Sequence, residues 1–165
     1  MALHFTSQEF KNRKESVLKE MRNAEIDALL MFKQESMYWL TGYDTFGYVF
    51  FQCLILEKSG NIILLTRAPD LRQAQNTSII KDIRIWIDKD GANPNEDLKK
   101  ILNELKLEGK KIGIEYDAYG LTGRNAMLLN KSLNCYYKIE DRSELISKLR
   151  VIKSVEEILY VRKAA

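Results

Sequence analysis

The side chains that could bind a metal ion are few and scattered along this sequence. His4 is the only histidine, and it lies on an N-terminal segment that is expected to be mobile. A zinc site needs several histidine or cysteine ligands, and a carboxylate site needs clustered acids. Asp44, Glu115 and Asp117 are the acids nearest to expected strand ends or loops, where isolated carboxylates are usually solvated. We therefore predict no metal site and no cofactor in this chain.

Nucleophilic catalysis finds equally little support. A Ser-His-Asp or Cys-His arrangement would have to use His4, and Cys53 lies in an apolar run where a thiol is normally inert packing. Cys135 lies in a second apolar run, and there is no CxxC spacing, so two buried free thiols are expected. The glycine segments 42–47 and 120–123 lack the lysine and the spacing of a phosphate-binding loop. We predict no catalytic residue here.

Aromatic side chains are concentrated in one short segment. Seven of the sixteen phenylalanine, tyrosine and tryptophan residues fall between positions 37 and 51. Phe50 and Phe51 continue an expected strand, so both are predicted to belong to the core. Tyr43, Phe46 and Tyr48 instead lie in a glycine-bounded loop, where large rings are hard to bury locally.

Two interpretations of this loop stay open. Its rings fold back on to the core, or they contact a ligand or a partner molecule, as rigid aromatic anchors on loops often do. Rings around the carboxylate of Asp44 would suit a small cationic or zwitterionic ligand through cation–π attraction. The candidate binding residues are therefore Tyr43, Asp44, Phe46 and Tyr48.

A second charged corner follows the expected hairpin. Arg67, Asp70 and Arg72 surround Pro69, which can open a short helix. One interpretation is a solvated helix start, with Asp70 near the positive end of the helix dipole. The other is an anion-binding or subunit-contact corner built from the two arginines.

Hydrophobic periodicity and turn residues define the elements that must position these residues. The expected strands are 26–32, 48–56, 62–66, 82–87, 111–115 and 135–139. The expected helices begin at the capping box Thr6-Ser7-Gln8-Glu9 and continue with 36–40, 69–75, 94–105, 122–133 and 143–149. Strands alternating with helices, together with one hairpin, predict an α/β fold with a mixed sheet.

Length and charge narrow the class of protein. The 165 residues suffice for one domain, and 26 basic against 23 acidic side chains give a net charge of +3. This balance is too small to predict a nucleic acid or an anionic membrane as partner. No apolar run approaches the roughly 20 residues of a membrane span, and no signal-peptide pattern is present, so we expect a cytoplasmic chain.

The C-terminal segment predicts a domain boundary. Ser154-Val155-Glu156-Glu157 is a capping box followed by good helix interior, yet the chain stops at Ala165 without a terminating glycine, asparagine or proline. We therefore expect residues 1–150 to form one domain, and residues 151–165 to begin a linker helix into a further, C-terminal domain.

Several segments in order resemble a known family. The chain is similar to the N-terminal domain of the creatinase, prolidase and aminopeptidase P family over nearly its whole length, through segments 26–30, 38–43, 112–115, 145–154 and 157–158. The longer segments 35–48 and 65–70 look most like the ectoine-hydrolase branch.

This resemblance implies a ribonuclease-H-like mixed sheet flanked by helices. In relatives it precedes a "pita-bread" catalytic domain that holds two divalent metal ions (Mn, Zn or Co) or, in creatinase, none. Family members are commonly homodimers, in which this domain reaches over the active site of the partner subunit. In creatinase a Phe-Gly-Arg turn contacts the substrate there, and the matching positions here are Phe46-Gly47-Tyr48. Tyr48 replaces the arginine, which argues against creatine itself.

The resemblance therefore implies a non-catalytic substrate-lid and dimerisation domain of a C–N bond hydrolase. Its substrate would be a small zwitterion such as an Xaa-Pro dipeptide, a creatine-like or an ectoine-like molecule. Phe46, Tyr48, Tyr43 and Asp44 would contact it across the dimer, and Arg67, Asp70 and Arg72 would form a subunit contact. The alternatives are a stand-alone peptide- or protein-binding module without catalysis and, ranked last, a nucleic-acid binder.

Overall fold

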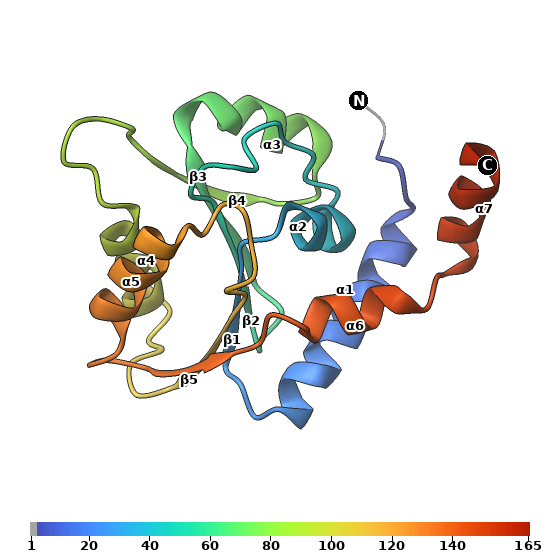
Figure 1. Ribbon diagram of the computed structural model, residues 1–165. Helices are drawn as coiled ribbons and strands as arrows, with labels where there is room; N and C mark the ends of the chain where they lie inside the picture. Colours follow the sequence, from blue (N-terminus) through green and yellow to red (C-terminus); the bar gives the residue numbers. More distant parts are fainter. Residues whose placement is uncertain (1–2) are drawn as a thin grey trace.

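The computed structural model describes residues 3–165, which form one mixed sheet with helices on both sides (Figure 1). The strands are β1 (Ala28–Met31), β2 (Cys53–Glu57), β3 (Ile62–Arg67), β4 (Asp82–Trp86), β5 (Lys111–Ile114) and β6 (Lys138–Asp141). The helices are α1 (Ser7–Asn23), α2 (Gln34–Thr41), η1 (Ala68–Asp70), α3 (Leu71–Thr77), α4 (Pro94–Glu104), α5 (Gly123–Leu133), α6 (Leu145–Val151) and α7 (Val155–Ala164).

The six strands lie in the order β4-β3-β2-β1-β5-β6. The β2–β3 hairpin is antiparallel, and β2 also pairs antiparallel with β1, whereas the β1–β5, β3–β4 and β5–β6 pairs are parallel. Leu30 in the middle of the sheet pairs with Ile55 on one side and Ile114 on the other. The prediction of an α/β fold with a mixed sheet and one hairpin is confirmed.

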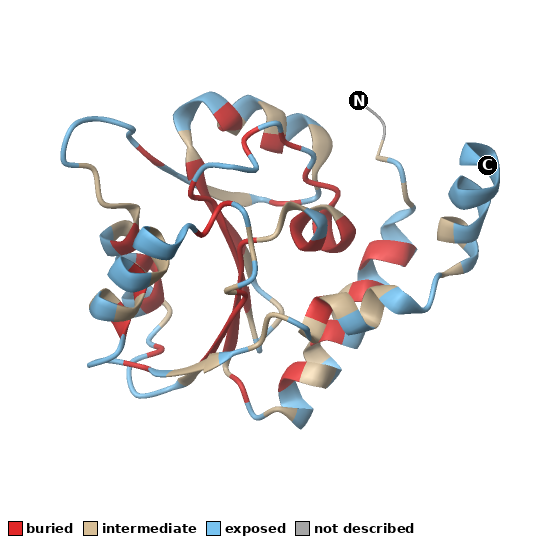
Figure 2. Cartoon of the chain, viewed as in Figure 1, coloured by how far each residue is buried: buried red, intermediate tan, exposed pale blue. Residues whose placement is uncertain are grey.

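Both faces of the sheet are buried, and Figure 2 shows its central strands in red. Side chains alternate along β1 because successive residues of a strand point to opposite faces. Ala28 and Leu30 join a core formed with α4 and α5, whereas Leu29 and Met31 join a core formed with α1, α2, α3 and α6. The sheet is thus the middle layer of three.

The predicted helix starts are confirmed where a polar side chain caps the helix. The side chains of Thr6, Asn93, Thr122 and Ser154 each accept a hydrogen bond from a backbone N–H in the first turn of the following helix. At Ser154 the reciprocal bond from its backbone N–H to Glu157 is also present, which completes the capping box.

The strand predicted over residues 48–56 begins later than expected. Residues 48–50 form a turn in which the Phe50 N–H donates to the carbonyl of Gly47 at 3.0 Å, and β2 starts only at Cys53. The prediction that Phe50 is a core residue is wrong, because its ring is 43% exposed, whereas Phe51 is buried as predicted.

Two other elements are displaced. The strand predicted over 135–139 is β6 at Lys138–Asp141, because the chain is still turning after α5, with the Tyr137 N–H bonded to the carbonyl of Leu133 at 3.0 Å. Cys135 in that turn is exposed, which contradicts the prediction of two buried thiols, and only Cys53 is buried. Helix α2 begins at Gln34 and not at Ser36.

Helix α7 lies at the outer edge of the fold (Figure 1), where it contacts residues 4–6. None of its side chains is buried. The backbone N–H of Thr6 donates to Glu156 at 3.1 Å, and the Tyr160 hydroxyl donates to the carbonyl of His4 at 2.6 Å. Among the described residues, no helix combines the length and the apolar character that crossing a membrane requires.

Candidate functional site

The loop of residues 43–50, here called the aromatic loop, rests on a buried polar cluster. The Tyr43 hydroxyl donates to Oε1 of Gln52 at 2.5 Å, and the Thr66 hydroxyl donates to the same oxygen at 2.7 Å. Burial raises the pKa of Tyr43, and no part of its side chain is exposed. The structure therefore corrects the expectation that the Tyr43 ring is hard to bury: this ring supports the loop from below and does not face a ligand.

The backbone at the tip of the loop is fixed by the same cluster. Nε2 of Gln52 donates to the Gly47 carbonyl at 2.7 Å, and the Gly47 N–H donates to the Thr45 hydroxyl at 2.9 Å. The Thr45 hydroxyl donates in turn to Asp70 at 3.4 Å. A Cβ at Gly47 would lie 2.6 Å from Nε2 of Gln52 and 2.8 Å from Oδ1 of Asp70, so only glycine fits here.

The charged residues after β3 complete the polar contacts beneath the loop. Nε of Arg67 donates to Oδ2 of Asp70 at 3.0 Å, and the guanidinium lies 3.5 Å from the centre of the Phe50 ring. Asp70 is buried, so the expectation of a solvated carboxylate at a helix start is wrong. Arg67 and Asp70 are engaged within the chain, whereas Arg72 is exposed on α3. We call Thr45, Gln52, Arg67 and Asp70 the polar frame.

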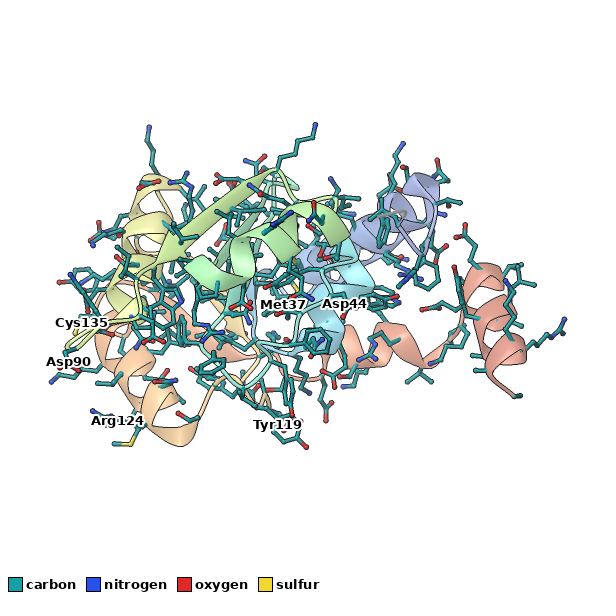
Figure 3. The ribbon with its side chains drawn as sticks, turned by 90° about the horizontal axis from the view of Figure 1, so that it is seen from above. Met37, Asp44, Asp90, Tyr119, Arg124 and Cys135 are labelled. Carbon is teal, nitrogen blue, oxygen red and sulfur yellow. The ribbon has the colours of Figure 1, made fainter. Side chains whose placement is uncertain are left out.

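Above this frame the loop displays apolar surface. Phe46 is 91% exposed, about half of the Tyr48 side chain is exposed, and Asp44 is exposed as well. Figure 3 labels Asp44 beside the ribbon of α2. The loop therefore combines a backbone fixed by hydrogen bonds with a phenylalanine ring that is almost fully exposed.

A cavity of about 670 Å³ opens next to the aromatic loop. It is bordered by residues that follow β1 and β5, by Tyr48 and by two residues of α6: Phe32, Lys33, Gln34, Glu35, Tyr48, Tyr116, Asp117, Ala118, Tyr119, Ser147 and Arg150. Nζ of Lys33 forms an ion pair with Asp117 at 3.0 Å, and the rings of Tyr48 and Tyr119 meet edge to face with centres 6.3 Å apart.

Glu115, which directly follows β5, binds the residues that directly follow β1. Its carboxylate accepts the backbone N–H groups of Phe32 and Lys33, both at 3.1 Å, and the Ser36 hydroxyl at 2.6 Å. The prediction of a solvated carboxylate is wrong for Glu115, which is completely buried and accepts hydrogen bonds from the start of α2. Burial raises its pKa to about 7, although the hydrogen bonds from Ser36 and Lys33 act in the opposite direction.

One side chain connects the start of α2 to the aromatic loop. Nε2 of Gln34, the first residue of α2, donates to the carbonyl of Thr45 at 2.7 Å. The backbone N–H of Lys33, immediately before it, is held by Glu115. The position of the loop therefore depends on the start of α2 as well as on the polar frame.

The remaining candidates for chemistry lie apart from one another. The ring of His4 is within 2.6 Å of the Tyr38 hydroxyl, and burial raises the pKa of Cys53 well above its usual value. Within residues 3–165, no group of three or more histidine, cysteine, aspartate or glutamate residues could hold a metal ion.

The supporting residues were missed at the level of sequence, although a signal was present. Gln52 interrupts an apolar run and Glu115 ends one, and a polar residue in an otherwise buried strand must find partners. Their partners lie up to 83 positions away in the sequence, as with Phe32 and Glu115, so periodicity could not name them.

Comparison with known proteins places the chain in a family. The family model of the creatinase/prolidase N-terminal domain matches residues 13–152. The ectoine hydrolase of Halomonas elongata is 29% identical over 171 residues, which cover 99% of this chain and 43% of that protein. An uncharacterised hydrolase/peptidase of Sinorhizobium fredii is also 29% identical, and covers 98% of this chain and 43% of its own length. The chain thus spans less than half the length of these relatives.

Solved structures share the fold. The prolidase of Thermococcus sibiricus superposes with a TM-score of 0.79 at 23% identity, over 97% of this chain and 42% of that one. A dipeptidase of Pyrococcus horikoshii gives a TM-score of 0.72 at 24% identity, over 89% of this chain and 38% of that one. The resemblance read from the sequence is confirmed, and the chain belongs to the creatinase/prolidase N-terminal domain family.

Proposed function

We propose that this chain is the non-catalytic substrate-lid and dimerisation domain of a C–N bond hydrolase. The family match and the hydrolases among its relatives support a hydrolase as the whole protein. The aromatic loop would enter the active site of the partner subunit, and a catalytic domain after residue 165 would supply the reacting groups.

One observation carries this proposal, namely the exposed Phe46 ring on a fixed backbone. Exposing an apolar ring to water is unfavourable, and about 25 cal/mol is gained for each Å² that a partner covers. The frame residues Gln52 and Thr45 hold the backbone around Gly47, so little conformational entropy is lost when the ring is buried. Such a preorganised aromatic anchor is typical of a residue that contributes strongly to binding.

The proposed substrate class rests on the resemblance and on the exposed rings of the loop. A compact zwitterion such as an Xaa-Pro dipeptide, a creatine-like or an ectoine-like molecule would lie beneath the rings of Phe46 and Tyr48. The carboxylate of Asp44 would face its cationic part. Arg72, exposed on α3, would contribute to the subunit contact near the polar frame.

The resemblance also implies a divalent metal ion (Mn, Zn or Co) for the hydrolase. Residues 3–165 offer no group of ligands that fits such an ion. In this proposal the catalytic domain would hold the ion.

The direct test is the substitution Phe46→Ala in the full-length protein. We expect kcat/KM to fall by about tenfold or more, because the substitution removes the exposed aromatic ring that would cover the partner's substrate pocket. The matched control is Tyr136→Ala. This substitution also removes a partly exposed aromatic ring, but Tyr136 follows α5 and lies outside the aromatic loop. A change of less than about threefold for Phe46→Ala would show that the loop has no such role.

A mixed dimer distinguishes whether the aromatic loop contacts the active site of the partner subunit or that of its own subunit. Subunits with Phe46→Ala are combined with subunits whose catalytic domain has been inactivated. If the loop acts across the dimer, the intact Phe46 of the inactive subunit restores activity to the active site of the other subunit. No gain in activity on mixing would contradict this arrangement.

A further inference from the structure

The cavity beside the aromatic loop lies at a special point of the sheet. The chain leaves β1 towards α2 on one face, and it leaves the neighbouring parallel strand β5 towards α5 on the opposite face. The two connections diverge, and a crevice forms outside the carboxyl ends of these strands. Such a crevice is the usual place for a ligand in an open α/β sheet.

The walls of the crevice come from both connections. Lys33, Gln34 and Glu35 follow β1, and the segment 116–119 follows β5, while Arg150 comes from α6. The volume of about 670 Å³ is in the range of small-molecule sites. In Figure 3 the labelled Tyr119 side chain projects outward at the edge of the molecule.

The two connections are held together closely. On one side the connection after β5 packs against the aromatic loop: a Cβ at Gly120 would lie 2.8 Å from the carbonyl oxygen of Phe50 and 3.0 Å from that of Tyr48, so glycine permits the contact. On the other side Glu115 binds the backbone of Phe32 and Lys33. The walls are therefore fixed before any ligand arrives.

Two basic side chains, Lys33 and Arg150, and two acidic ones, Glu35 and Asp117, line the crevice. Lys33 is paired with Asp117, whose side chain is 86% exposed and retains a free face. Within residues 3–165, the guanidinium of Arg150 forms no ion pair. Arg150 can thus bind a carboxylate, to which a guanidinium group donates two parallel hydrogen bonds. Asp117 and the faces of Tyr48 and Tyr119 can receive an ammonium group.

We propose that this crevice binds a small zwitterion of dipeptide size, with its carboxylate on Arg150 and its ammonium group between Asp117 and the two tyrosine rings. The site lies entirely within this chain. It therefore goes beyond the function proposed above and does not depend on it.

The test is a titration of the ¹⁵N-labelled 165-residue chain with glycyl-leucine, followed by NMR. We expect saturable shifts of the backbone amides in segments 33–35, 116–119 and 147–150. N-acetyl-glycyl-leucine lacks the ammonium group and glycyl-leucinamide lacks the carboxylate, and each should bind about tenfold more weakly. Absence of saturable shifts up to the solubility limit of glycyl-leucine would overturn the proposal, as would a blocked peptide that binds as tightly as glycyl-leucine.

A pair of matched variants tests the assigned cation. Arg150→Gln should raise the dissociation constant of glycyl-leucine about tenfold. Arg124→Gln, at an exposed arginine of α5 that does not line the crevice, should leave it unchanged. An equal effect of both substitutions would mean that only net charge matters, and the assignment of Arg150 would be wrong.

Discussion

Glu115 carries an ionisable group into a region that water does not reach. A buried carboxylate costs free energy unless donors compensate it, and here three donors do so. Burial nevertheless raises the pKa of Glu115 from 4.5 to about 7. The folded state thus holds this proton more tightly than the unfolded chain does.

The stability of the chain should therefore depend on pH in a defined window. Between pH 4.5 and 7 the folded state binds more protons than the unfolded state, so the free energy of unfolding falls as the pH rises. The full effect of this residue is about 3 kcal/mol. Urea unfolding at a series of pH values measures it.

The substitution Glu115→Gln isolates this residue from other groups that titrate. Its amide oxygen can accept the N–H groups of Phe32 and Lys33, and its NH₂ group can donate to the Ser36 hydroxyl, as the protonated acid would. We expect the variant to fold and to lose most of the pH dependence between pH 4.5 and 7. An unchanged slope in the variant would show that other groups cause it.

For single residues, the sequence predicted which loop side chains are exposed better than it predicted which side chains hold the loop in place. Phe46, Tyr48 and Asp44 were selected as loop residues, and all three are exposed. Tyr43 was selected with them and is buried, because Gln52, just before β2, and Thr66 of β3 bring polar partners to its hydroxyl. Such partnerships are made in space, and no pattern of neighbouring residues contains them.

Helix α7 shows how an element is held without a buried side chain. Oε1 of Glu157 accepts the indole N–H of Trp39 at 2.9 Å and lies 3.3 Å from the buried guanidinium of Arg13. Its other oxygen caps the helix through the Ser154 N–H at 2.8 Å. One carboxylate therefore both caps α7 and attaches it to α1 and α2.

Glu157→Gln should loosen this attachment while the helix itself persists. An amide offers only one accepting oxygen, so its NH₂ group must face one of the donors, at Trp39 and Arg13 or at Ser154. We expect hydrogen exchange in α7 to accelerate about tenfold, which corresponds to about 1.4 kcal/mol. Mass spectrometry of exchanged peptides measures this change.

The control for this prediction is Arg162→Gln on the same helix. Arg162 is exposed, so its substitution changes charge without removing a buried contact. Equal acceleration in both variants would show that Glu157 does not anchor the helix.

Element boundaries were predicted where a local chemical signal marks them. Capping residues such as Thr122 and Ser154 located helix starts to within one residue. The start of β2 was missed, because Tyr48, Val49 and Phe50 have the composition of a strand yet turn under the hydrogen bond to Gly47. Tertiary context overrides strand propensity at such positions.

The whole molecule is organised around a sheet shared by two cores. Alternation of strands and helices predicted this class of fold, but the order of the strands depends on which helices cross which face. Successive residues of a central strand contact opposite cores, as Leu29 and Leu30 of β1 do. Loss of either core should therefore remove the support of the sheet for both.

We accordingly predict that the two layers unfold in one transition, and the two tryptophans can report it. Trp39 is buried in the core with α1 and α2, and Trp86 is buried in the core with α4 and α5. Trp86→Phe leaves Trp39 as the only indole, and Trp39→Phe leaves Trp86. In each variant the urea midpoint from fluorescence should equal the midpoint from far-UV circular dichroism, because one cooperative unit unfolds. Two separate midpoints within one variant would show that the sheet does not couple the layers, and that each core is stable alone.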